Sequence, residues 1–171
     1  MTGRQVALLR GVNVGGRRIT GPEMVEIAAG AGFEGASSYQ ASGNLVFDTD
    51  LARRAIEARV AHAWAAARDW EIEVFVRTLP DLVAAVERLP FTADQMAGLG
   101  KPQVGFAHAA VDVSALTVDR DLVAAEGTEI YWVPHTGVSD ADLDMADFSR
   151  LDGPVTFRTL GTIERIISKF G

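Results

Sequence analysis

The order of hydrophobic patterns in the first half of the chain constrains its fold more than any other feature. Over residues 5–77, short segments that are continuously apolar or alternate between apolar and polar residues are separated by longer segments whose apolar residues recur every three or four positions. The short segments are typical of β-strands and the longer ones of amphipathic helices. In chain order, they predict a strand, a helix, two strands, a second helix and a final strand.

Capping and turn residues define the expected elements further. The expected strands cover residues 5–14, 38–41, 45–48 and 72–77. Thr20 and Glu23 have the spacing of a capping box at the start of the first helix, and Gly32 is placed to end that helix. Thr49 and Asp50 are expected to cap the second, longer helix.

This order of elements is that of the split βαβ, or ferredoxin-like, arrangement, in which an antiparallel sheet carries both helices on one face. Ser42-Gly43-Asn44 separates the two middle strands, either as a tight hairpin turn or as a bulge within one long strand. Further along, a helix is expected to end at Pro90, and Thr162 is expected to cap a closing helix. Strands are expected at residues 103–109, 129–133 and 155–158. We therefore expect two domains, residues 1–78 and residues 79–171, the second a small α+β half packed against the first.

The charge distribution singles out the N-terminal segment. The chain has 171 residues and a formal net charge of −7, yet residues 1–22 contain Arg4, Arg10, Arg17 and Arg18 and no acid. This local charge of +4 leaves −11 for the remaining residues. A sequence pI near 4.9 makes nucleic acid an unlikely partner, because affinity for phosphate backbones increases with the number of cations presented.

Composition excludes several other classes of protein. The chain has no cysteine, so it has no disulfide, no thiolate nucleophile and no cysteine-based metal site. No apolar run reaches the roughly 20 residues that a membrane-spanning helix needs. The apolar stretch near the N-terminus is too short and too interrupted by charge for a signal peptide. We expect a cytoplasmic protein that makes no contact with a membrane.

The cationic segment contains the candidate binding motif, Leu8-Leu9-Arg10-Gly11-Val12-Asn13-Val14-Gly15-Gly16-Arg17-Arg18. Glycines expose backbone N–H groups and arginines offer planar arrays of donors, a combination that suits an anion. Gly11 and Gly16 have P-loop spacing, but Arg17-Arg18 replaces the required Lys-Ser/Thr pair, and the motif is not Gly-x-Gly-x-x-Gly. Both nucleotide fingerprints are therefore rejected. The alternative is that the glycines only form a tight turn and the arginines are solvated.

A second group of polar residues lies in the turn between the two middle strands. In a ferredoxin-like sheet the first strand and the inner strand of the ββ pair are neighbours or nearly so, and we therefore expect the two motifs to converge. The candidate ligand-binding residues are Arg10, Asn13, Gly15, Gly16, Arg17, Ser42, Asn44 and, nearer the C-terminus, Arg158. In this hypothesis the arginines neutralise the anion, the glycine N–H groups bind it, and the asparagines and the serine orient it.

No catalytic residue stands out. Ser42 is not in the Gly-x-Ser-x-Gly context of a nucleophile elbow, and the three histidines lack the spacing of metal ligands. Asp140, Asp142 and Asp144 resemble the start of a calcium loop, but Met145 stands where that loop requires glycine. The expected sheet also lacks the paired aromatic residues of an RNA-recognition motif. We therefore expect no metal and no cofactor, and the sequence assigns no reaction.

Two motifs in the first half give the chain a family resemblance. The segment Leu8–Gly16, Met24, and Tyr39-Gln40-Ala41-Ser42-Gly43-Asn44-Leu45-Val46-Phe47 together resemble the bacterial family called domain of unknown function 1697 (DUF1697). The resemblance continues more weakly through Leu89-Pro90-Phe91 and Tyr131-Trp132-Val133-Pro134 and covers essentially the whole chain. It implies two ferredoxin-like halves, hence an α+β fold with mainly antiparallel sheets and helices on one face. It supplies no reaction.

The chain departs from the family pattern near its C-terminus. Relatives typically carry an Arg-Asn-x-Asn-Thr signature, whereas this sequence has Arg158-Thr159-Leu160-Gly161-Thr162 and lacks both asparagines. If those asparagines belong to the family's site, their loss implies a changed ligand or a lost activity.

The sequence leaves two classes of function open. The first is a protein that binds a small anionic or phosphate-bearing ligand through the N-terminal motif. The second is a protein–protein interaction or self-assembly module in which the same basic edge docks an acidic surface. Such a surface is available on a second copy, since residues 112–152 contain ten acids against only Arg120 and Arg150. RNA binding is the least favoured hypothesis. The sequence does not indicate an oligomeric state.

Overall fold

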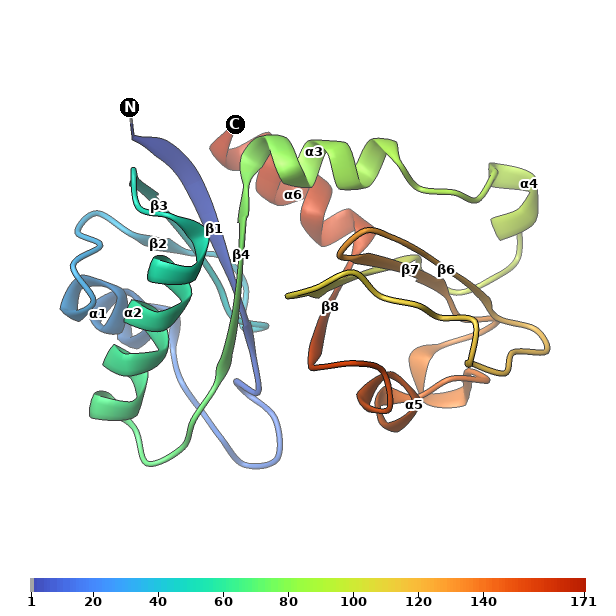
Figure 1. Cartoon of the computed structure of the whole chain (residues 1–171), viewed down its shortest axis with the longest axis horizontal. Helices are drawn as coiled ribbons and strands as arrows, with labels where there is room; N and C mark the ends of the chain where they lie inside the picture. The colour runs from blue at the N-terminus through green and yellow to red at the C-terminus, as the bar shows by residue number, and fades with distance from the viewer. Residues whose placement is uncertain (1) are drawn as a thin grey trace. The chain divides into compact units, whose positions relative to one another are not determined.

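The computed structural model describes residues 2–171, which form two compact units (Figure 1). The first unit extends to Leu82 and also contains Phe170–Gly171, and the second unit covers Val83–Lys169. Each unit is built around its own four-stranded sheet.

The first sheet has the strand order β2-β3-β1-β4, and all of its neighbouring strands are antiparallel. Its strands are β1 (Gly3–Arg10), β2 (Ser37–Ser38), β3 (Asn44–Thr49) and β4 (Glu73–Thr78). The helices α1 (Gly21–Gly30) and α2 (Arg53–Ala67) cover one face of this sheet (Figure 1). Leu9, Phe47 and Val76 from three strands share a core with Ile27 of α1 and Val60 of α2. The predicted ferredoxin-like arrangement is confirmed.

The second sheet repeats the topology of the first. Its order is β6-β7-β5-β8 with antiparallel neighbours, which is the same order when the strands are counted from β5. The strands are β5 (Gln103–Ala107), β6 (Leu122–Glu126), β7 (Glu129–Val133) and β8 (Val155–Thr159). The predicted α+β fold with two ferredoxin-like halves is therefore confirmed.

The connections of the second sheet differ from those of the first. Residues 108–121 join β5 to β6 without a helix, and only a short helix lies between β7 and β8. The remaining helical elements are α3 (Leu79–Glu87), α4 (Ala93–Met96), the 3₁₀ turn η1 (Val138–Asp140), α5 (Met145–Ser149) and α6 (Leu160–Phe170). Within residues 2–171, no helix is both long and apolar enough to cross a bilayer.

Several boundaries in the first unit follow from local chemistry, and one of them corrects the prediction. The capping box of Thr20 and Glu23 starts α1, and Gly32 follows the helix with a φ of 89°, as expected. β1 ends at Arg10 instead of continuing to residue 14, because Gly11 and Asn13 have φ values of 91° and 52°, which a strand does not contain.

Three further predictions of element boundaries were wrong. The strand expected at residues 38–41 is only Ser37–Ser38, because Gln40 has a φ of 59° and turns the chain. α2 starts at Arg53 without a side-chain cap, and Thr49 belongs to β3. α6 starts at Leu160, ahead of the expected cap residue Thr162.

Candidate functional site

The segment between β1 and α1, residues 11–20, forms an exposed loop that we call the basic loop. At its tip the N–H of Arg17 donates to the carbonyl of Val14 at 3.0 Å, and the central Gly15 and Gly16 have φ values of 55° and 85°. Two consecutive positive φ angles define a type I′ turn, a conformation that favours glycine. The N–H groups of both glycines have no acceptor within residues 2–171.

Asn13 holds the basic loop in place. Its Nδ2 donates to the carbonyl of Ala41 at 2.7 Å, and its Oδ1 accepts from the N–H of Ile19 at 2.9 Å. One side chain thus joins the start of the loop to its end and to the turn that precedes β3. Asn13 has a structural role that the sequence did not reveal, and its direct contact with a ligand stays a prediction.

The turn that precedes β3 is organised by Asn44, whose side chain is fully buried. Its Nδ2 donates to the carbonyl of Tyr39 at 2.7 Å and to the hydroxyl oxygen of Ser42 at 3.1 Å. Ser38 pairs with Leu45, so β2 and β3 form a hairpin and not one bulged strand. The connection is residues 39–43 and Asn44 belongs to β3, so the tight turn predicted at Ser42-Gly43-Asn44 is wrong.

This turn packs closely against the end of β1. The N–H of Leu9 donates to the carbonyl of Gly43 at 2.8 Å. A Cβ atom on Gly43 would lie only 2.4 Å from Cγ2 of Val12, so the contact requires glycine. Together with the Asn13–Ala41 hydrogen bond, these contacts confirm that the two sequence motifs converge.

Three arginines at the basic loop keep an uncompensated positive charge. Arg10, Arg17 and Arg18 are exposed, and their side chains make no hydrogen bond or ion pair within residues 2–171, although Glu73 lies opposite Arg10 in the register of β1 and β4. Arg17 folds back over the loop, since a Cβ on Gly11 would lie 3.5 Å from its Nη1. Several arginines elsewhere contact carboxylates, namely Arg4 with Asp48, Arg53 with Asp81, Arg68 with Glu23 and Arg120 with Asp142, whereas Arg54 and Arg59 on α2 do not.

Arg158, the remaining candidate, belongs to the second unit, where it is buried in β8. Its Nη1 donates to the hydroxyl oxygen of Thr156 at 2.9 Å and to the carbonyl of Phe157 at 2.8 Å. Burial lowers the pKa of its guanidinium to about 10, so Arg158 stays charged at neutral pH. These contacts tie the side chain to its own strand, and its place in a ligand site stays a prediction.

The second unit contains a polar cluster that the sequence analysis did not identify. Asp121, Trp132, His135 and Asp142 form it, and we call it the Asp121 cluster. Oδ1 of Asp121 accepts from both the main-chain N–H and Nδ1 of His135, at 2.9 Å and 2.8 Å. Oδ2 accepts from Nε1 of Trp132 at 2.8 Å and from the N–H of Leu143 at 3.2 Å.

Asp142 completes the cluster by ordering the chain before β6. Its Oδ2 accepts the backbone N–H groups of Asp119, Arg120 and Asp121. The N–H groups of Arg120 and Asp121 hold the pKa of Asp142 well below its ordinary value. Burial alone raises the pKa of Asp121, but hydrogen bonds from Trp132 and His135 outweigh this effect and leave that pKa lowered.

The spacing of the Asp121 cluster raises the question of a metal ion. Candidate ligand atoms of Asp121, His135 and Asp142 all lie within 4.8 Å of one another. However, both oxygens of Asp121 already accept two N–H groups each, which accounts for the usual lone-pair capacity of a carboxylate. A cation would have to displace these bonds. We therefore assign the cluster to structure, as a hub that holds β6, β7 and the following loop together.

The fold and the paired N-terminal motifs place the chain in a family. The sequence matches the family described as "Protein of unknown function (DUF1697)" over residues 1–131, and the chain belongs to that family. It is similar in structure to the conserved bacterial protein SP0830 from Streptococcus pneumoniae, with a TM-score of 0.76, 20% sequence identity and 98% coverage of both chains. At this identity the likeness concerns the fold alone. No curated protein matches the sequence.

Proposed function

We propose that the basic loop, together with Arg10, binds a small anionic or phosphate-bearing ligand. One observation carries the proposal: Arg10, Arg17 and Arg18 are exposed at and just after the end of one strand, and none of them makes an ion pair within residues 2–171 of a chain whose net charge is −7. Unpaired cations on an acidic protein attract anions, and arginine matches the planar geometry of phosphate and carboxylate oxygens.

The backbone of the loop supports the same assignment. The type I′ turn presents the N–H groups of Gly15 and Gly16 without an internal acceptor, and Arg17 lies over Gly11 beside them. Fixed N–H groups next to guanidinium groups supply donors for several oxygens of one anion. The Asn13 bonds hold this arrangement before a ligand arrives, which lowers the entropy lost on binding.

Within this proposal the candidate residues divide into two groups. Arg10 and Arg17 neutralise the anion, and Gly15 and Gly16 donate backbone hydrogen bonds to it. Asn13, Ser42 and Asn44 shape the loop and the adjoining turn through the hydrogen bonds described above. Ser42 is exposed and accepts a bond from Asn44, so its own hydroxyl proton is available to an anion.

A thermal-shift screen with inorganic phosphate, sulfate, sugar phosphates and nucleotides tests the proposal. A ligand present at a hundredfold its dissociation constant adds about 2.7 kcal/mol of stability, which corresponds to a rise in Tm of roughly 5–10 °C for a chain of this size. We expect one compound class to give such a shift and Arg10→Ala or Arg17→Ala to abolish it.

Arg54→Ala is the matched control for this screen. Arg54 is an exposed arginine on α2 that also lacks a partner within residues 2–171, so its loss changes the net charge equally without touching the loop. A shift that persists in Arg10→Ala and Arg17→Ala, or that disappears equally in Arg54→Ala, would contradict the assignment.

A second candidate function is a protein–protein contact through the same loop, favoured by one observation. Val14, at the tip of the loop beside Arg17 and Arg18, is 56% exposed, the largest exposure among the large apolar side chains of residues 2–171. In the acidic segment 112–152 of a second copy, Asp121 and Asp142 are already bonded internally, so the exposed acids of that segment, such as Asp140 and Asp144, would make this contact. Self-association that weakens with salt and with Val14→Ser would favour this function over ligand binding.

A further inference from the structure

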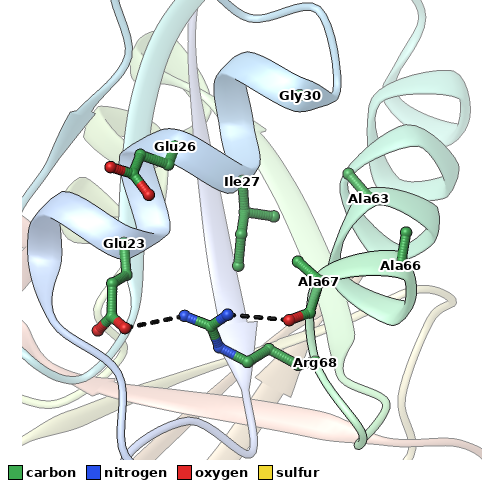
Figure 2. A pocket seen from close by; sticks show the side chains of 8 residues that line it. All are labelled: Glu23, Glu26, Ile27, Gly30, Ala63, Ala66, Ala67 and Arg68. Atoms are coloured by element: carbon green, nitrogen blue, oxygen red, sulfur yellow. Dashed lines mark hydrogen bonds and ion pairs between the residues drawn. The ribbon is translucent and has the colours of Figure 1, made fainter.

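We propose that the groove between α1 and α2 is a contact surface for a second copy of this chain, paired about a two-fold axis. The groove lies in the first unit and consists of two adjoining hollows of about 260 Å³ and 540 Å³. Both hollows are lined by Gly30, Ala63 and Ala66, which Figure 2 shows in the smaller hollow. This surface is separate from the basic loop, and the inference does not depend on the proposed function.

Small residues make up much of the lining of the groove. Gly30 of α1 and Ala66 of α2 are exposed. Small residues let another helix approach closely, which increases the packing contact available to a partner. At one end, Arg68 contacts Glu23 of α1 at 3.0 Å, which joins the two helices, and donates to the carbonyl of Ala67 at the end of α2 at 2.9 Å (Figure 2).

The charges along the groove are arranged so that the surface complements itself. The contact of Glu23, near the start of α1, with Arg68, just after the end of α2, shows that the helices run antiparallel. Glu26 precedes Gly30 by one helical turn, and Arg59 precedes Ala63 by one turn.

Because the helices are antiparallel, Glu26 and Arg59 lie about 6 Å from the middle of the groove in opposite directions. Neither side chain makes a hydrogen bond or ion pair within residues 2–171. A two-fold axis that lies in the surface at the middle of the groove, perpendicular to the line from Glu26 to Arg59, brings Glu26 of one copy opposite Arg59 of the other, twice per dimer.

Because the charges of the groove complement one another across the two-fold axis, the partner that fits the groove is a second copy of this chain. In a two-fold interface the same patch is used on both subunits, so a patch with an acid on one side and a base on the other pairs with itself when the axis lies midway between them. Charges of this kind fix the register and suppress other arrangements more than they add affinity. The small residues between the charges supply the packing.

Sedimentation equilibrium of the full chain over a wide concentration range tests the inference. We expect the average mass to rise toward twice that of one chain. Glu26→Arg and Arg59→Glu each place like charges together twice per dimer, and each is expected to weaken dimerisation by about tenfold or more. The double variant Glu26→Arg/Arg59→Glu restores opposite charges and is expected to recover most of the wild-type affinity.

Arg54→Glu provides the control, since it makes the same charge change on α2 at a residue that does not line the groove. Circular dichroism of each variant establishes that it is folded. A chain that stays monomeric at every concentration overturns the inference. So does a dimer that is insensitive to both reversals, or one that instead weakens with Arg10→Ala, because that dimer uses the basic loop.

Discussion

In the basic loop and at the adjoining end of β1, three arginine side chains are exposed without an ion pair in residues 2–171, whereas in the Asp121 cluster every carboxylate oxygen accepts at least one N–H group. Both regions concentrate polar side chains in loops next to a sheet of the same topology. This difference indicates that charged side chains serve two purposes in the protein, one structural and one, as we propose, in binding. Groups whose hydrogen-bonding capacity is satisfied internally hold the fold, and groups left unsatisfied at the surface are available to a partner.

The largest effect is expected from Asp121→Ala. This change leaves four N–H groups, donated by Trp132, His135 and Leu143, without their acceptor. Because buried donors without partners are costly, we expect a loss of about 3 kcal/mol or more in the free energy of unfolding, measured by urea denaturation.

Asp140→Ala is the control for this change, because Asp140 is an exposed acid in the same acidic segment. Its effect should stay within about 0.5 kcal/mol. If the two variants are equally stable, the Asp121 cluster is not a structural hub and its assignment must be revised.

Gly43→Ala is expected to have the next largest effect. The added methyl group pushes the turn that precedes β3 away from Val12 of the basic loop. The added Cβ would meet Cγ2 of Val12 at 2.4 Å, and the φ of 86° at Gly43 is unfavourable for alanine. We expect a loss of about 2–3 kcal/mol in unfolding free energy. Gly15→Ala, which has a positive φ but no atom within 4 Å of the added Cβ, should cost only about 1 kcal/mol.

Lowering the pH is a further test of the structural role of the Asp121 cluster. The pKa values of Asp121 and Asp142 are lowered in the folded state from an ordinary value of 3.8. Their stabilising contribution is therefore complete above about pH 5 and is lost as the pH falls through 3.8 toward the folded-state values. We expect unfolding free energy to decrease with pH below about 4, and Asp142→Asn to show a smaller dependence on pH in that range. An identical pH profile for the two proteins would contradict this assignment.

The smallest effect on stability is expected from the residues most important for the proposed function. Arg10→Ala and Arg17→Ala remove no hydrogen bond or ion pair within residues 2–171, so each should change the unfolding free energy by less than about 0.5 kcal/mol. A loss of 2 kcal/mol in either variant would show that the side chain has a structural role instead.

The sequence predicted most of the fold because hydrophobic spacing reports directly on strands and helices. It failed where spacing carries little information. β6, with the sequence Leu-Val-Ala-Ala-Glu, is a half-buried strand of mostly small residues without alternation, and it was not predicted. The end of β1 was also misplaced, because the apolar Val12 and Val14 extend the strand pattern past the turn of the backbone at Gly11.

The candidate site was only partly visible in the sequence. The arginines and glycines of the basic loop stood out because they are adjacent and cationic. The role of Asn13 was hidden, because its partner Ala41 lies 28 residues away. The Asp121 cluster was hidden for the same reason, since Asp121 and His135 are 14 residues apart with no recognised motif between them. A buried aspartate surrounded by aromatic and main-chain donors leaves no local pattern to find.

An NMR titration of the ¹⁵N-labelled chain with inorganic phosphate tests the central claim most directly. If the basic loop binds anions, the backbone amide signals of Gly15 and Gly16 and the side-chain Nε–H signals of Arg10 and Arg17 shift with one common, saturable dissociation constant. The same titration of the Arg10→Ala/Arg17→Ala variant should leave the glycine amides unmoved. Loop signals that do not move with phosphate in the wild-type protein, or that move equally in the variant, would contradict the claim that these unpaired arginines form an anion site.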